Sequence, residues 1–246
     1  MLKVSLITIC YNSEKTISRT IESILSQDYV NIEYIIIDGN SSDSTISIVN
    51  NYKDKICKVV SEEDSGLYDA LNKGANLATG DVVGFLHADD FYPNKNVISN
   101  MINIFSVNNK LDVVLGDVLF INNQGNTSRF YSGRNFDFDV GIMPPHPSVF
   151  IKRRCYEKFG YFNINYKIAS DYDLLFRFLV LNNLEYQYSK NIIVYMTLGG
   201  VSTKNIFSSI TLNMEIYKIH KAHQHPINLF KLLQKIPIRI KELLSK

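Results

Sequence analysis

The first hundred residues alternate between apolar runs and stretches whose apolar residues recur at helical spacing. Near-continuous apolar runs are typical of strands covered on both faces, and they predict strands at residues 4–10, 34–37, 56–60 and 81–86. Helical spacing predicts helices that carry residues 17–25, 46–49 and 68–78. Repeated β-α-β units imply a mostly parallel central sheet flanked by helices, with right-handed crossovers. We therefore predict an α/β fold.

Residues that cap or break helices mark the ends of these three helices. Asn12 or Ser13 is predicted to cap the first helix, and Asp43 or Ser44 the second. Gly80 is predicted to end the third helix, whose apolar side consists of Leu67, Leu71, Ala75 and Ala78. These apolar sides should face the sheet.

The second half of the chain predicts shorter elements. A helix is expected at residues 98–105 and a strand at 112–121, followed by a loop or hairpin over 122–140. Residues 144–147 form a proline-rich segment that cannot be helical. A strand at 148–151 and a helix holding Tyr156 and Phe159 should follow. Ser170 is predicted to cap a helix at 171–181, before strands at 186–189 and 192–197.

Composition places the chain among globular proteins. Of its 246 residues, 46% are hydrophobic and 20% charged, which excludes a disordered chain. Cys10, Cys57 and Cys155 are scattered without metal-ligand spacing, as expected of reduced thiols in the cytosol. We see no signal peptide and no run of 18 apolar residues, so the first two-thirds are expected in the cytoplasm. A GxGxxG fingerprint and a P-loop are absent, which disfavours dinucleotide dehydrogenases and P-loop NTPases.

Polar residues follow each of the first four predicted strands. They are Thr8 to Asn12, Asp38, Glu62 to Asp64, and the pair Asp89 and Asp90. Parallel sheets bind ligands beyond the carboxyl ends of their strands. Four polar clusters from separate loops should therefore converge on one edge of the sheet, which predicts a binding site there.

The acid pair follows the apolar run 82–86 directly. Adjacent carboxylates at the edge of a core repel each other unless cations or hydrogen-bond donors compensate them. Oxygen-rich sites of this kind suit Mg2+ or Mn2+, which in turn hold phosphate oxygens. The alternative is that Asp89 and Asp90 cap a turn, with Asp89 as the N-cap of a helix after Pro93.

Five motifs in order resemble family 2 of the inverting glycosyltransferases, of the bacterial surface-polysaccharide type with the GT-A fold. They are SLITICYN at 5–12, DGNSSDST at 38–45, YDALNKGANLATG at 68–80, FLHADD at 85–90 and ASDYDL at 169–174. The resemblance covers roughly residues 3–200. It implies a nucleotide-diphosphate sugar donor, a UDP- or GDP-sugar, and no nucleic-acid partner. It also implies a glycosyltransferase domain at 1–205, with residues 1–110 binding the donor and 111–205 the acceptor.

The resemblance assigns Asp89 and Asp90 to the metal-binding acids of the family, holding Mn2+ or Mg2+ against the diphosphate. His87 stands where the first acid often is, so it is either a ligand or a packing residue. The donor is expected to contact a further set of residues: Thr8, Tyr11, Asn12, Asp38, Asp64, Asn72 and Asp89. The alternative role of Tyr11 is packing over the loop, and the alternative role of Asp38 is to form a turn with Gly39.

Asp171 corresponds to the second acid of the family's Glu-Asp motif, whose role is to take the proton of the acceptor hydroxyl. Ser170 replaces the first acid, and Asp173 should lie on another helix face. The alternative for Asp171 is an ordinary acid in the first turn of a helix. His146 matches a family histidine that positions acceptor or phosphate, and a structural hydrogen bond is equally compatible with its place.

Residues 206–246 are predicted to form a C-terminal amphipathic helical extension. Within 227–246, five Lys and Arg residues and one Glu interleave with apolar residues, and Pro237 must break or kink any helix. This composition favours a peripheral contact with an anionic membrane at the inner face of the cell membrane. The competing interpretation is a helix docked on the domain or on a second subunit.

The resemblance implies transfer of a sugar from a nucleotide donor to a saccharide acceptor carried on a lipid, in bacterial surface-polysaccharide assembly. An alternative from another class is a non-catalytic nucleotide-sugar-binding or scaffold protein, because His87 and Ser170 replace acids. A nucleotidyltransferase is disfavoured, since residues 8–16 contain no glycine and one lysine, Lys15.

Overall fold

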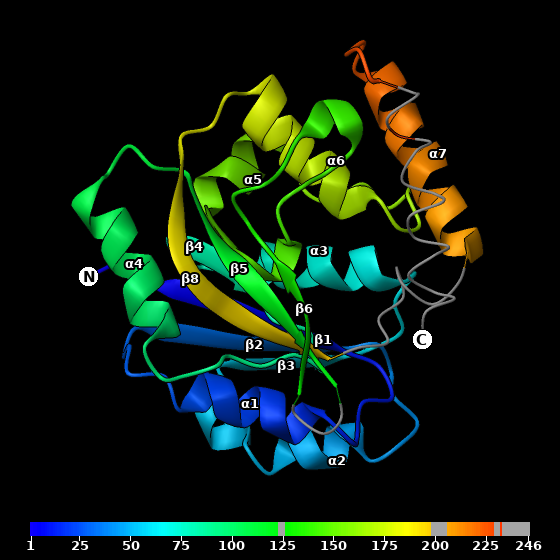
Figure 1. Cartoon of the computed structure of the whole chain (residues 1–246). Helices are drawn as coiled ribbons and strands as arrows, with labels where there is room; N and C mark the ends of the chain where they lie inside the picture. The colour runs from blue at the N-terminus through cyan, green and yellow to red at the C-terminus, as the bar shows by residue number, and fades with distance from the viewer. Residues whose placement is uncertain (123–125, 198–205, 229–231, 233–246) are drawn as a thin grey trace.

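The computed structural model describes residues 1–122, 126–197, 206–228 and 232. A twisted sheet lies at its centre, with helices packed on both faces (Figure 1). Strands β3-β2-β1-β4-β7-β5-β6 are neighbours in this order, and β8 pairs with β5. The strands are β1 Val4–Cys10, β2 Ile32–Asp38, β3 Lys58–Ser61, β4 Val82–Phe85, β5 Val113–Ile121, β6 Thr127–Tyr131, β7 Val149–Lys152 and β8 Tyr186–Thr197.

The N-terminal half is parallel, as predicted. β1 pairs with β2 and with β4, and β2 pairs with β3, all in parallel. In this register Cys10 lies opposite Asp38, and Asp38 lies opposite Ser61. The carboxyl ends of β1, β2 and β3 are therefore level, and the loops that follow them open at one edge.

The second half of the sheet adds antiparallel strands to the mostly parallel sheet that was predicted. β5 forms an antiparallel hairpin with β6, in agreement with the predicted loop or hairpin, and β7 runs antiparallel between β4 and β5, a direction that was not predicted. The two strands predicted at 186–189 and 192–197 are one strand, β8, parallel to β5 with register shifts near Asp117. Lys190, a polar residue between the two predicted strands, has a φ of 62°. The strand is irregular at this residue but continues through it.

The predicted helices form with small shifts at their ends, but the prediction that residues 144–147 cannot be helical is wrong, because a short 3-10 helix covers His146–Ser148 with proline in its first turn. The helices are α1 Ile17–Leu25, α2 Thr45–Asn50, α3 Leu67–Leu77, α4 Val97–Val107, α5 Arg153–Phe159, α6 Ser170–Phe176 and α7 Ile206–Ala222, with short helical segments η1 Lys53–Lys55, η2 Phe138–Val140, η3 His146–Ser148 and η4 Arg177–Leu181.

Two capping predictions are wrong. The residue at the N-cap of α1 is Thr16, and the carbonyl of Ser13 accepts from the Thr16 and Ile17 amides. Ser170 is the first residue of α6 rather than its cap, and its hydroxyl is buried without a hydrogen-bond partner in the described part of the chain.

Alternate residues of the central strands pack into two cores. Ile7 and Ile37 face α3, α5, α6 and α7, whereas Leu6 and Ile36 face α1, α2 and α4. Leu71 of α3 is 1% exposed as predicted, but Leu67 is 42% exposed and lies outside the core. The loops after β1, β2 and β3 therefore extend from a sheet that is covered by helices on both faces.

Candidate active site

The loop after β4 carries the acid pair, and its two carboxylates have different surroundings. Asp89 is partly buried, whereas Asp90 is 1% exposed. Asp90 Oδ1 accepts from the Thr197 amide at 3.3 Å, and its Oδ2 is buried with no partner among the described residues. Burial, and then the charge of Asp89, raise the pKa of Asp90. Asp89 therefore carries the accessible carboxylate, and Asp90, predicted as a second ligand, turns inward.

The alternative role of Asp89 as a helix cap is excluded, because α4 begins at Val97 with Asn96 at its N-cap. The backbone of the acid loop is held instead by Arg19 and Thr197. Arg19 Nη2 donates to the Asp89 carbonyl at 3.1 Å and to Thr197 Oγ1 at 2.9 Å. The Thr197 hydroxyl donates to the same carbonyl at 2.7 Å. Sequence reasoning missed both residues, since they come from α1 and the end of β8.

The donor set of this loop fits a hard divalent cation that is shared with a phosphate ligand. No group of three or more His, Cys, Asp or Glu residues in the described ranges is arranged to hold a metal alone. Mg2+ typically binds through one or two carboxylates and completes its shell with phosphate oxygens and water. Asp89 provides one carboxylate, and the unpartnered Oδ2 of Asp90 lacks the compensation that a nearby cation would supply.

Two neutral histidines lie beside the acid loop. Burial lowers the pKa of His87, and the nearby Asp89 opposes that shift. His146 is 4% exposed, with ring centroids 5.4 Å from Phe85 and 5.3 Å from Phe162. Burial, together with His87, lowers the pKa of His146 to about 3, and its Nε2 is buried with no partner in the residues described. His146 is therefore a neutral hydrogen-bonding group and cannot neutralise a phosphate.

Tyr11, Gly39 and Asp64 meet where the loops after β1, β2 and β3 converge. Tyr11 is 65% exposed, so its ring is open to a ligand. A Cβ atom on Gly39 would lie 2.5 Å from Asp64 Oδ2 and 3.5 Å from Tyr11 Cδ2, so only glycine allows this approach. Asp64 Oδ1 accepts from the Gly66 amide at 2.8 Å. The predicted convergence of these three loops is confirmed by these contacts.

Asp38 and Thr8 lie deeper than the surface of the site. Asp38 is 0% exposed, and its carboxylate accepts from the Ser41 amide at 3.0 Å and the Ser61 hydroxyl at 2.7 Å. Thr8 is also 0% exposed, and its Oγ1 accepts from the Tyr34 hydroxyl at 3.1 Å. Asp38 thus stabilises the turn after β2, and Thr8 packs inside the sheet layer, so neither offers surface to a nucleotide here.

Asn12 and Asn72 use their amides to hold the backbone. Asn12 has a φ of 48°, and its Oδ1 accepts from the Ser42 amide at 2.9 Å, which joins the loops after β1 and β2. Asn72 donates to the Phe162 carbonyl at 2.8 Å and accepts from the Phe162 amide at 2.9 Å. Asn72 therefore fixes the ring of Phe162 against the site, which is an indirect role.

Asp171 lies in the first turn of α6, partly buried, beside Tyr68 of α3. Its Oδ1 accepts from the Tyr172 amide at 2.8 Å and from the Tyr68 hydroxyl at 3.4 Å. Burial raises the pKa of Asp171 to about 6, against the lowering effect of these hydrogen bonds. A carboxylate with such a pKa is suited to accept a proton near neutral pH.

A continuous series of contacts connects Asp171 with the acid loop. Tyr68 stacks on Phe162 at 6.0 Å between ring centroids, and Phe162 packs edge-on against His146. His146 and Phe162 both pack on Phe85, the last residue of β4, at ring-centroid distances of 5.4 and 5.6 Å, and the loop that carries Asp89 begins there. The structure thus brings the predicted base and the predicted metal-binding loop to the two ends of one aromatic and histidine cluster.

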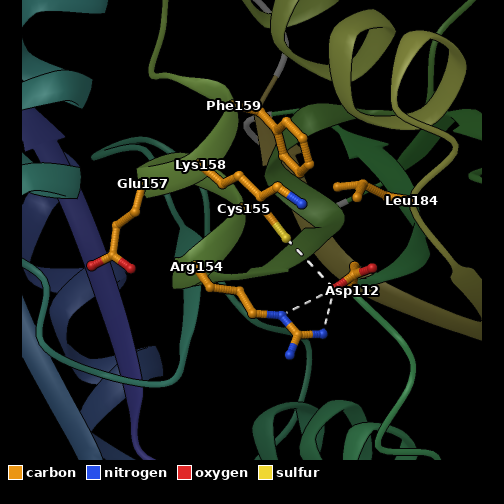
Figure 2. Close-up of a pocket in the computed structure, with 7 residues that line it drawn as sticks. All are labelled: Asp112, Arg154, Cys155, Glu157, Lys158, Phe159 and Leu184. Atoms are coloured by element: carbon orange, nitrogen blue, oxygen red, sulfur yellow. Dashed lines mark hydrogen bonds and ion pairs between the residues drawn. The ribbon is translucent and has the colours of Figure 1, made fainter.

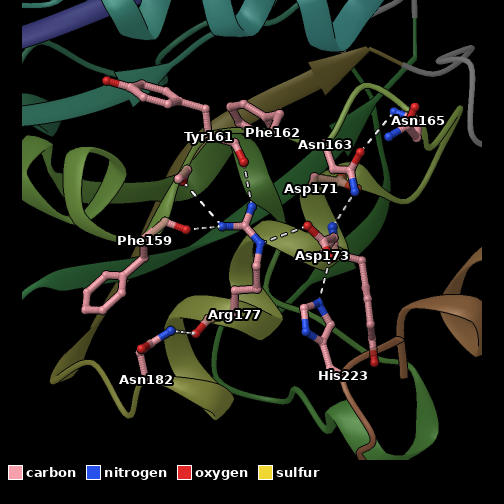
Figure 3. Close-up of polar contacts among 12 residues, drawn as sticks. Phe159, Tyr161, Phe162, Asn163, Asn165, Asp171, Asp173, Arg177, Asn182 and His223 are labelled. Atoms are coloured by element: carbon pink, nitrogen blue, oxygen red, sulfur yellow. Dashed lines mark hydrogen bonds and ion pairs between the residues drawn. The ribbon is translucent and has the colours of Figure 1, made fainter. Parts of the chain in front are cut away.

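Asp173 is engaged elsewhere, on another face of α6 as predicted. It is 2% exposed and accepts from Arg177 Nε at 2.9 Å and interacts with His223 Nε2 at 3.2 Å. Arg177 also donates to the carbonyls of Phe159 and Tyr161, each at 2.6 Å (Figure 3). This network holds α6 against the loop before it and excludes Asp173 as a second base.

A separate hollow of about 530 Å³ lies at the opposite edge of the sheet, by the start of β5 (Figure 2). Arg154 pairs with Asp112 at 2.7 Å, and the Cys155 thiol donates to the same carboxylate at 3.7 Å. Burial and Asp112 raise the pKa of Cys155 to about 12, so the thiol is not a nucleophile at neutral pH. Arg154, one cation of this hollow, is already paired with Asp112, which disfavours its use as a phosphate ligand.

Comparisons with known proteins agree with this arrangement. A PGL/p-HBAD biosynthesis glycosyltransferase of Mycobacterium bovis is 27% identical over 205 residues, which cover 80% of this chain and 78% of that protein. An uncharacterized glycosyltransferase of Rickettsia typhi is 30% identical over 197 residues, covering 75% of this chain and 61% of that protein.

Solved structures share the fold. S. aureus TarS in complex with UDP superposes with a TM-score of 0.66 at 22% identity, covering 87% of this chain and 65% of that one. The mannosyltransferase PcManGT from Pyrobaculum calidifontis, in complex with GDP-Man and Mn2+, gives a TM-score of 0.69 at 17% identity, covering 98% and 69%. Residues 5–181 match the family described as glycosyl transferase family 2. The chain therefore belongs to glycosyl transferase family 2.

Proposed function

We propose that this protein is an inverting glycosyltransferase that uses a nucleotide-diphosphate sugar. One observation carries the proposal: Asp171, a carboxylate with a pKa of about 6, contacts Tyr68 in a cluster with Phe162 and His146, and this cluster packs on Phe85 at the start of the loop that carries Asp89. A base and an anion-binding loop at the same site are what displacement of a diphosphate by a hydroxyl requires. Release of nucleotide diphosphate in the presence of a saccharide acceptor tests it.

The donor is bound at the edge where the loops after β1, β2 and β3 meet. The exposed ring of Tyr11 provides a surface on which a base can stack, with the carboxylate of Asp64 beside it. TarS has been solved with UDP and with UDP-GlcNAc, and PcManGT with GDP-Man, which supports a nucleotide-sugar donor. The bound nucleotide is either a uridine or a guanosine diphosphate.

A divalent cation, Mn2+ or Mg2+, would be held by Asp89, with Asp90 behind it. When bound, it would compensate the charge that develops on the diphosphate as the sugar leaves. Arg19 and Thr197 keep the Asp89 backbone in place for this role. The complex of PcManGT with Mn2+ supports the choice of metal.

Asp171 takes the proton in the transfer step. The acceptor oxygen forms a bond with the anomeric carbon from the face opposite the diphosphate, and the bond from that carbon to the diphosphate oxygen breaks. The hydroxyl proton passes to Asp171, and the nucleotide diphosphate departs with the electron pair. Tyr68, which contacts Asp171 Oδ1 at 3.4 Å, orients the carboxylate.

The rate should fall in acid because a protonated Asp171 cannot accept a proton. With a pKa of about 6, kcat/KM for transfer should drop about tenfold per pH unit below pH 6 and level off above pH 7. The measurement is kcat/KM from pH 5 to 8 at saturating Mn2+, with nucleotide binding checked at pH 5. A flat profile over this range would exclude Asp171 as the base.

The acceptor is proposed to be a saccharide on a lipid carrier at an anionic membrane, in bacterial surface-polysaccharide assembly. In the ranges described, no helix is both long and apolar enough to cross a bilayer. The outward face of α7 exposes Ile210, Met214 and Tyr217 beside Lys218 and Lys221, which suits an anionic lipid surface. The basic segment predicted at 227–246 lies outside the described residues except for 227, 228 and 232.

Removing residues 233–246 should weaken membrane association and spare catalysis. Leu232 is 2% exposed and its amide bonds the Asn228 carbonyl, so a cut after Leu232 leaves this packing in place. We expect less co-sedimentation with phosphatidylglycerol vesicles and a donor hydrolysis rate within about twofold of the full chain. Phosphatidylcholine vesicles are the control. Equal sedimentation of both proteins with anionic vesicles would refute the contact through this segment.

A nucleotide-sugar-binding protein without turnover is the second candidate. It is favoured by His87 and Ser170, which stand where the resemblance to the family implies acids. Such a protein would bind donor but release no nucleotide with any acceptor, and the Asp171 variant described below would then change nothing.

A further inference from the structure

Helix α7 lies outside residues 5–181, the part of the chain that matches the family, yet its inner face packs on the helix that carries Asp171. Ile216 and Ile219 are buried in the same core as α6, and Glu215 is 7% exposed. Figure 1 shows α7 beside α6 at one side of the sheet. A buried carboxylate such as that of Glu215 needs hydrogen-bond donors, and its donors lie next to the start of α6.

Glu215 binds three consecutive backbone amides. Its Oε1 accepts from Lys167 at 2.9 Å, and its Oε2 accepts from Ile168 and Ala169, each at 3.0 Å. These residues directly precede α6, whose N-cap, Ala169, has no side chain able to cap the helix. Glu215 therefore fixes, from a distant helix, the N-cap residue of α6 and the two residues before it.

The same segment is held from its other side by α3. The Tyr68 hydroxyl donates to the Ile168 carbonyl at 2.6 Å and contacts Asp171 Oδ1. Residues 167–169 are thus fixed between Glu215 and Tyr68, and Asp171 follows two residues later. A displacement of this segment would move the carboxylate of Asp171.

His220 of α7 and His223, which directly follows α7, contact two residues just after Asp171. His220 Nε2 and the Tyr172 hydroxyl are 2.8 Å apart, and His223 Nε2 lies 3.2 Å from Asp173 Oδ1 (Figure 3). The chain on both sides of Asp171 is therefore attached to α7. His220 is 0% exposed, so this contact belongs to the packed interior.

Glu215 also brings a second carboxylate near Asp171. Ser170, the residue before Asp171, is 0% exposed and its hydroxyl has no partner in the chain as described. The titratable groups that influence the pKa of Asp171 are Tyr68 from α3 and Glu215 from α7. The charge of Glu215 also contributes to the raised pKa of Tyr166. After burial, the negative charge of Glu215 contributes to the raised pKa of Asp171.

We propose that Glu215 is a positioning residue for sugar transfer: it fixes residues 167–169 so that Asp171 faces the site. The inference rests on the proposed function, in which Asp171 takes the acceptor proton. It assigns a catalytic purpose to a helix outside the matched family domain.

The test is Glu215→Gln, which keeps the size of the side chain, removes its charge and turns an N–H toward one of the three amides. We expect kcat to fall about 10- to 100-fold and the KM for the nucleotide sugar to stay within about twofold. The acid limb of kcat/KM should move to lower pH, because Asp171 loses a negative neighbour. Glu185→Gln, an exposed substitution before β8, is the matched control and should match the wild type.

A purely structural role would lower kcat and donor affinity together and leave the acid limb in place, and that result would overturn the inference. An unchanged kcat in Glu215→Gln, with Asp171→Asn inactive, would also overturn it while leaving the proposed function intact. Activity in Asp171→Asn would instead reject the proposed function. If Glu215→Gln does not fold, Glu215→Asp provides the same comparison: a lower kcat at unchanged donor affinity supports the inference, and equal losses in both reject it.

Discussion

Replacing Asp171 by asparagine should reduce sugar transfer about a thousandfold and leave nucleotide binding within about twofold of wild type. The expected loss is large because asparagine preserves the shape and the Oδ1 contacts to Tyr68 and Tyr172 but cannot accept a proton. The measurement is single-turnover transfer to acceptor, paired with calorimetric titration of UDP and GDP.

The control for this variant is Asp54→Asn, which changes an exposed acid in η1 far along the chain from the site. It should transfer sugar at the wild-type rate. Retention of more than about a tenth of the activity by Asp171→Asn would mean that another group takes the proton.

The second large effect is expected at the acid loop, where Asp89 and Asp90 should respond differently. Asp89→Asn should lower turnover about a hundred- to a thousandfold and abolish its stimulation by Mn2+, since a metal at a developing charge contributes several kcal/mol. Asp90→Asn should cost less than about tenfold, because the buried Asp90 has a raised pKa and an amide resembles its protonated form.

Turnover against Mn2+ concentration, measured for both variants and for wild type, separates these outcomes. Equal losses of Mn2+ response in Asp89→Asn and Asp90→Asn would show that both carboxylates hold the ion. Full activity of Asp89→Asn in a chelator would reject the metal-binding role of the loop.

Much of the fold follows from local sequence pattern. The buried strands β1, β2 and β4 are nearly continuous apolar runs, and this pattern identifies them as strands whichever strands lie beside them. Strand direction could not be predicted in the same way, because the sequence of residues 149–152 does not indicate that β7 runs antiparallel between β4 and β5. The polar residues Lys190 and Asn191 likewise resemble a turn, but tertiary pairing with β5 carries β8 through them.

The site could be predicted where its residues form local motifs. Asp89, Asp64 and Asp171 stand directly after a strand or at the start of a helix, and the structure places each at the expected end of its element. The depth of Asp38 and Thr8 could not be predicted, since it depends on Ser61 and Tyr34 from other strands.

Residues that act on the site from a distance left no signal in the sequence. Arg19 is one polar position on an amphipathic helix, and Glu215 is the only acid in the described helix α7. Their partners are backbone groups of Asp89 and of residues 167–169, and backbone groups have no sequence signature. Only the folded chain shows that these side chains contact the backbone at Asp89 and next to Asp171.

The most direct test of glycosyl transfer is a panel of UDP- and GDP-sugars, incubated with the purified protein and a bacterial lipid extract as the source of acceptor. We expect one donor to release its nucleotide diphosphate with Mn2+, at a rate that chelator and Asp171→Asn both suppress. If every donor in the panel gave the same release with wild type as with Asp171→Asn, the account of this site as a sugar-transferring centre would be contradicted.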